Sequence, residues 1–98
     1  MHNTISTEQL DKYFSITKEA LEKAKNAFNE TRKEQAEDCF DMASRYYDDA
    51  KFFLQQKDDA VLAFAALNYA HGWLDAGARL GLFKVNDSRL FTVDEQPL

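Results

Sequence analysis

The sequence predicts an all-α protein, an antiparallel three-helix bundle with a short extended C-terminal tail. Apolar residues recur at three- and four-residue steps in three successive segments, which is the spacing of one face of a helix. Only 3 glycines and 1 proline occur among the 98 residues, too few for the turns of an all-β fold. The length suits one domain, so residues 1–98 are expected to form a single helical-bundle domain.

The first helix is expected over residues 6–29. Ser6 or Thr7 can cap its N-terminus, and Gln9 follows Ser6 at the spacing of a capping box. One face carries the apolar residues that recur at helical steps, namely Leu10, Phe14, Leu21, Ala24 and Phe28. This face is predicted to pack on the rest of the bundle.

The second helix is expected over residues 33–56, where small and aromatic side chains share one stripe with a coiled-coil period. The boundary at residues 29–32 contains neither glycine nor proline, so one long bent helix is the alternative at this point. The link at residues 55–57 is short. It should therefore bring the third helix back antiparallel to the second.

The third helix is expected over residues 58–82, with Asp58 as its N-cap and Gly81 as its C-cap. Its core face is predicted from a turn of about 100° per residue to hold Leu62, Ala63, Ala66, Leu67, Ala70, Trp73, Leu74, Gly77 and Leu80. A glycine within a helix costs roughly 1 kcal/mol relative to alanine. Gly72 and Gly77 therefore predict some gain in packing. Aromatic side chains of the first two helices are expected to fill the space beside the small residues, namely Phe14, Phe28, Phe40, Tyr47 and Phe53.

The tail, residues 83–98, differs in character from the helices. Asn86, Asp87 and Ser88 predict a turn. Leu90, Phe91 and Val93 are expected to lie against the bundle as an extended strap.

The composition excludes several classes of function. The net charge is −5 and no basic stripe is visible, so we expect neither nucleic acid nor an anionic membrane surface as a partner. No apolar run approaches the roughly 20 residues of a membrane span. The single cysteine, Cys39, cannot form an internal disulfide, and the N-terminus lacks the pattern of a signal peptide. These features predict a cytoplasmic protein with a free, buried thiol.

One polar ridge on the third helix is the only group of side chains that suggests chemistry. It consists of Asn68, His71, Asp75 and Arg79, which step by three and four residues. His71 and Asp75 could orient an imidazole or offer two ligands, and Arg79 could receive a carboxylate or a phosphate. The alternative is an ordinary ion pair between Asp75 and Arg79 with a half-buried His71. No catalytic residue, metal site or cofactor is predicted.

A second strip lies between this ridge and the core face. It consists of Ala65, Tyr69, Gly72 and Ala76, and in a monomer it should face solvent although it carries no charge. Small, uncharged and flat surfaces are typical of helix–helix contacts. The strip is therefore a candidate interface, with a homodimer or an unidentified protein as the partner.

The run over residues 46–83, YYDDAKFFLQQKDDAVLAFAALNYAHGWLDAGARLGLF, has a familiar pattern. With ALNYAHGWLDAG at residues 66–77, RLGL at 79–82 and RLFTV at 89–93, it resembles a small archaeal family catalogued as domain of unknown function 357. The resemblance implies a three-helix bundle of the spectrin-repeat-like kind and an archaeal cytoplasmic source. It implies no activity and assigns no catalytic residue.

The functional prediction follows from these features. A non-enzymatic protein-interaction module, self-associating through the third helix, is the leading hypothesis. The rival is a small-molecule or metal-binding protein, conceivably an enzyme, that uses the ridge of His71, Asp75 and Arg79.

Overall fold

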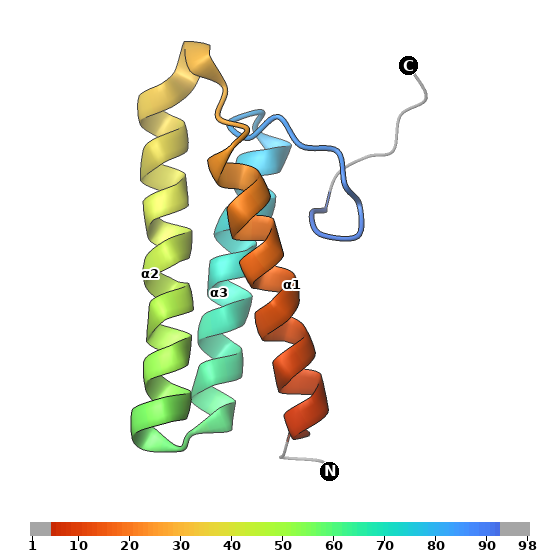
Figure 1. The fold of residues 1–98 in the computed structure, drawn as a ribbon. Coiled ribbons are helices and arrows are strands. Elements are labelled where there is room, and N and C mark those ends of the chain that lie inside the picture. Colours follow the sequence, from red (N-terminus) through yellow and green to blue (C-terminus); the bar gives the residue numbers. More distant parts are fainter. Residues whose placement is uncertain (1–4, 93–98) are drawn as a thin grey trace.

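The computed structural model describes residues 5–92 of the chain and shows three long helices there, so the predicted three-helix bundle is confirmed. They are α1 (Thr7–Lys25), α2 (Lys33–Lys57) and α3 (Ala60–Arg79), and the short 3-10 helix η1 (Glu30–Arg32) precedes α2. Neighbouring helices along the chain run in opposite directions (Figure 1). The most extensive packing joins α2 to α3, and α1 leans across this pair. No helix of the described residues is long and apolar enough to cross a membrane.

The helical conformation is interrupted between α1 and α2, so the alternative of one long bent helix is excluded. The capping box of Ser6 and Gln9 is present at the start of α1, as predicted. The helix ends at Lys25, earlier than expected, with Asn26 as its C-cap. Asn29 then caps η1 and also donates a side-chain hydrogen bond of 2.9 Å to the Gly81 carbonyl. Asparagine caps, rather than glycine or proline, therefore mark this boundary.

The turn between α2 and α3 corrects one predicted cap. Asp58 does not cap α3 but ends α2 in the left-handed region, with a φ of 49°. Asp59 is the N-cap of α3, and its carboxylate accepts a hydrogen bond of 2.9 Å from the Leu62 amide. Aspartate tolerates the left-handed conformation better than most residues, which lets the first of the two neighbouring aspartates form the turn. At the other end of α3, Gly81 has a φ of 75° and the Leu82 amide donates to the Gly77 carbonyl at 2.8 Å, the expected glycine cap.

The core consists of two clusters of buried side chains. The first lies toward the α2–α3 turn and joins Leu10, Ala50, Ala63, Ala66 and Leu67. The predicted aromatic side chains pack around the two clusters without being fully buried themselves: Phe14, Phe28, Phe40, Tyr47 and Phe53.

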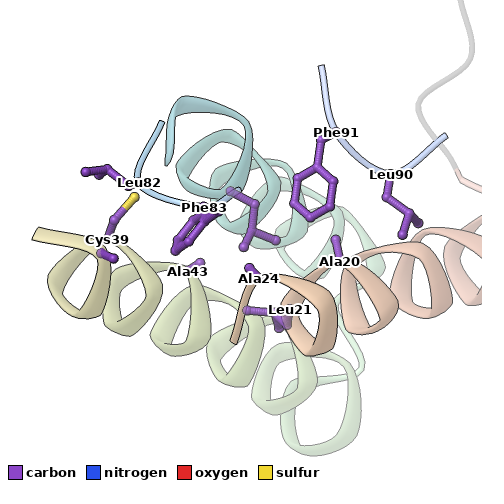
Figure 2. Packing of buried hydrophobic residues seen from close by; sticks show 11 residues of the cluster. Ala20, Leu21, Ala24, Cys39, Ala43, Leu82, Phe83, Leu90 and Phe91 are labelled. Carbon is purple, nitrogen blue, oxygen red and sulfur yellow. The ribbon is translucent and has the colours of Figure 1, made fainter. Parts of the chain in front are cut away.

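The second cluster contains residues from the segment that follows α3. We call residues 83–92 the strap. Phe83 lies beside Cys39 and Ala43, and Phe91 points toward Ala20 (Figure 2). Phe83, Leu90 and Phe91 are at most 2% exposed, so the strap is part of the core. The prediction that Leu90 and Phe91 lie against the bundle is thereby confirmed. Val93, predicted to join them, and residues 94–98 lie outside the described residues.

Three residues predicted for the core face of α3 are not buried. The exposed fractions are 46% for Leu62, 36% for Trp73 and 60% for Leu80. The prediction placed the centre of the face correctly, because the residues buried in the described part of α3 are Ala63, Ala66, Leu67, Ala70, Leu74 and Gly77. The predicted core face is wider than the buried face of the structure, because it also included these three exposed residues. Within residues 5–92, α3 is covered by α1, α2 and the strap, and these three residues lie beyond the edge of that cover.

The two glycines inside α3 have different surroundings. A Cβ atom at Gly77 would overlap the Phe83 ring and would lie 3.1 Å from the Cys39 sulfur. A Cβ atom at Gly72 would meet nothing within 4 Å. The packing gain predicted for both glycines is therefore present for Gly77, and among the described residues there is none at Gly72.

Gly77→Ala should lower the free energy of unfolding by about 1–3 kcal/mol, because an added methyl group has no room beside Phe83. Gly72→Ala is the matched control, and should raise that free energy by up to about 1 kcal/mol through helix propensity alone. Urea denaturation followed by circular dichroism measures both. A Gly77→Ala protein as stable as the wild type would contradict the tight contact.

Candidate functional site

The two central residues of the polar ridge lie beneath the strap. The His71 ring is half-buried, with Nδ1 at 3.1 Å from the Thr17 hydroxyl and Nε2 at 2.5 Å from the Leu90 carbonyl. A carbonyl oxygen only accepts hydrogen bonds, so Nε2 carries a proton and donates it. In the neutral ring, Nδ1 then accepts a hydrogen bond from Thr17. Both ring nitrogens of His71 are thus occupied in joining α1, α3 and the strap.

Asp75 lies one helical turn beyond His71 and holds the next part of the strap. One carboxylate oxygen accepts a hydrogen bond of 2.8 Å from the Thr92 amide, and the other accepts one of 3.2 Å from the Thr92 hydroxyl. Asp75 lies 3.9 Å from the His71 ring, between Oδ1 and Nε2. Together the two side chains fix the backbone of the strap at residues 90 and 92.

Charged side chains fasten the strap to α1. The Lys23 ammonium donates to the Asp87 carboxylate at 2.8 Å, and the Arg89 guanidinium binds the Glu19 carboxylate. The hydrogen bond from Lys23 is the main cause that lowers the pKa of Asp87 below its ordinary value. The hydrogen bond to Glu19 correspondingly raises the pKa of Arg89. These pairs are exposed, so each is a modest contribution to the attachment of the strap.

A cavity of about 370 Å³ lies beside the ridge, between α1 and α3. Its walls include Tyr13, Thr17, Asn68, His71 and Asp75. In the described part of the chain, every buried side-chain nitrogen or oxygen has a hydrogen-bond partner. No group of three or more histidine, cysteine, aspartate or glutamate side chains there is arranged to hold a metal ion. The cavity therefore has room for a small ligand, but its two central polar side chains already serve the strap.

The other two ridge residues, Asn68 and Arg79, lie at the two ends of the ridge. Asn68 is exposed and borders both this cavity and the strip described below, and Arg79 is exposed in the last turn of α3. The structure thus brings His71 and Asp75 together in one arrangement and leaves Asn68 and Arg79 at the surface. Ligand binding by the four residues stays a prediction.

Cys39 is free and buried, as predicted. Its thiol donates a hydrogen bond of 3.1 Å to the Trp73 carbonyl. Burial raises the pKa of Cys39, so the thiol stays protonated near neutral pH and is a poor nucleophile. Its role is packing between α2 and α3.

The predicted interface on α3 is an exposed apolar surface. We call Ala65, Tyr69, Gly72 and Ala76 the outer strip, and all four are exposed. With Asn68 and Trp73 they line an open depression of about 680 Å³. The Tyr69 side chain is 64% exposed, and its ring stacks on that of Tyr46 in α2 at 5.1 Å between centroids.

This apolar surface is larger than the sequence predicts. Leu62, Trp73 and Leu80, predicted for the core, lie beside the outer strip and extend it along α3. Among residues 60–79 the only ionisable side chains besides Tyr69 are His71, Asp75 and Arg79, and none belongs to the strip. α3 is therefore apolar around most of its circumference, which is typical of a helix that is covered on all sides.

These features define a class of protein: a small three-helix bundle whose last helix carries an uncovered apolar face. The family model described as "Protein of unknown function (DUF357)" matches residues 12–83, and the chain belongs to this family. The match covers most of α1 and all of α2 and α3, and the strap beyond Phe83 lies outside it. No curated protein and no solved structure matches the chain.

His71→Ala should lower the free energy of unfolding by about 1–3 kcal/mol, because it leaves the buried Thr17 hydroxyl and the Leu90 carbonyl without their partner. Asn68→Ala, an exposed neighbour on the same ridge, should change it by less than about 0.5 kcal/mol. Thermal and urea unfolding measure both variants. Unchanged stability of His71→Ala would remove its role in holding the strap and would favour the ligand hypothesis.

The attachment of the strap should weaken in acid. The pKa of Asp87 is lowered in the folded protein, so its stabilising effect is fully present above the ordinary value of 3.8 and is lost as the pH falls through the lowered value. Asp87→Asn removes this charge at every pH. Amide hydrogen exchange in residues 84–91 should therefore differ between wild type and Asp87→Asn at pH 6 and converge toward pH 3. A constant difference across this range would contradict the assignment.

Proposed function

We propose that this protein is a non-enzymatic protein-interaction module that self-associates through the outer strip of α3. The observation that supports this most directly is the uncharged, apolar face that extends from Leu62 to Leu80 outside the core. Contiguous exposed apolar surfaces are a common mark of interaction sites. Burying them stabilises a complex by roughly 25 cal/mol for each Å² of apolar surface.

The absence of charge on this surface is compatible with a second copy as the partner. The chain has a net charge of −5, so two copies repel each other wherever acidic faces approach. The outer strip and its apolar neighbours Leu62, Trp73 and Leu80 carry no charge. Association through this face therefore keeps most of the acidic side chains of the two copies apart.

Binding of a small molecule or a metal at the ridge, with or without catalysis, is the second candidate. The cavity of about 370 Å³ beside His71 supports it. It ranks second because both nitrogens of His71 and both carboxylate oxygens of Asp75 already bind residues of this chain. We place the protein in the reducing cytoplasm, where the free thiol of Cys39 persists.

Sedimentation equilibrium tests the leading proposal. At concentrations up to about 1 mM, where an association free energy of about 4 kcal/mol is detectable, the average mass should exceed that of one chain. Ala76→Glu should reduce it to one chain, because the variant buries an unpaired charge in the contact. Gln55→Glu adds the same charge on an exposed part of α2 and should leave the mass unchanged. A wild-type protein that stays monomeric throughout would contradict self-association.

A further inference from the structure

The outer face of α3 has the spacing of a helix that pairs with another helix. Its central positions step by three, four, three, four and three residues: Leu62, Ala65, Tyr69, Gly72, Ala76 and Arg79. This alternation is the heptad pattern of residues that face a partner in a coiled coil. The four central members are the outer strip, and they are exposed on one continuous surface. The face can therefore receive another helix along its whole length.

The spacing of these six positions is the same in either direction along the helix. A point midway between Tyr69 and Gly72 exchanges these two residues, and it equally exchanges Ala65 with Ala76. A two-fold axis through this point would bring a second α3 against the first in the opposite direction. In the central layers, the large Tyr69 of one copy then lies over the small Gly72 of the other. The outermost layer places Leu62 beside the aliphatic part of Arg79.

A parallel arrangement of the same two faces fits less well. It would oppose Tyr69 to Tyr69 and Gly72 to Gly72, which creates a protrusion in one layer and a void in the next. Close packing disfavours both. The order of large and small residues in the strip thus favours the antiparallel arrangement.

Gly72 supplies an independent reason. Alanine is the better helix former, and a Cβ atom at this position would meet nothing within 4 Å of the chain. Within residues 5–92, no neighbouring atom requires a glycine at this position, in contrast to Gly77. A ring lying directly on the helix backbone would require one. The exposed ring of Tyr69, supported by its stacking on Tyr46, is the matching group on a second copy.

We infer that two copies of this chain pair antiparallel through their outer strips, with Tyr69 of each copy packed on Gly72 of the other. This inference rests on the self-association proposed above, and it adds the direction and the register of the contact. In this register Ala65 of one copy is adjacent to Ala76 of the other. In a parallel pair these two positions are about 16 Å apart along the helix.

Charge complementation tests the register. Ala76→Glu and Ala65→Lys should each be monomeric alone, whereas an equimolar mixture should form a heterodimer, because the two new charges meet at one end of the contact and the other end stays wild type. Mixing Ala76→Glu with Ala76→Lys is the matched control. It should stay monomeric in the antiparallel arrangement and associate in a parallel one. Sedimentation of each mixture, with one partner fluorescently labelled, gives the result.

Gly72→Ala tests the contact itself. It should weaken dimerisation at least about tenfold while the chain becomes no less stable to urea, because the added methyl group meets only the second copy. A wild-type protein that never dimerises would overturn the self-association as a whole. A dimer that Ala76→Glu disrupts but Ala65→Lys does not restore would overturn the antiparallel register alone. Unchanged affinity of Gly72→Ala would overturn the packing of Tyr69 on Gly72.

Discussion

The rest of the structure depends on the close approach of α2 and α3. The inner face of α3 carries Ala63, Ala70 and Gly77, and the facing stripe of α2 carries Ala36, Ala43 and Ala50, all of them buried. Small side chains let two helix backbones come near each other, and dispersion between them then adds along the full length of the contact. The two helices are therefore closely packed, but the small side chains between them contribute little apolar volume to the core. Larger groups must come from elsewhere to complete the core.

The strap supplies these larger groups, which explains why a segment without regular secondary structure is so firmly held. Phe83 and Phe91 are the largest buried side chains of the second cluster. Their backbone leaves the end of α3 and crosses α1, so its polar groups need partners along that path. His71 and Asp75 provide them at Leu90 and Thr92. Two of the four ridge residues, His71 and Asp75, thus serve to hold the strap in the core.

Most of the fold could be predicted from the sequence, because helix periodicity and caps are local. The capping box at Ser6 and the glycine cap at Gly81 are properties of a few neighbouring residues. The partners of His71 could not be predicted in this way, because Thr17 and Leu90 lie 54 and 19 residues away in the chain. The width of the core face of α3 also depends on tertiary structure. A helical wheel gives the direction of a face, whereas the cover provided by α1, α2 and the strap decides whether Leu62 and Leu80 are buried.

The outer strip was predicted from an absence of charge, and the structure gives that absence a sharper meaning. An uncharged strip alone would fit any apolar partner. Gly72 narrows the choice of partner. It weakens its own helix, and no atom of the described residues needs the space that a Cβ would take, so we infer that a group of the partner occupies this space. Tyr69 narrows the choice of partner further. A two-fold axis between two antiparallel copies of α3 would place Tyr69 of one copy on Gly72 of the other. With the heptad spacing, these two residues are the basis for proposing a second copy of α3, running in the opposite direction, as the partner.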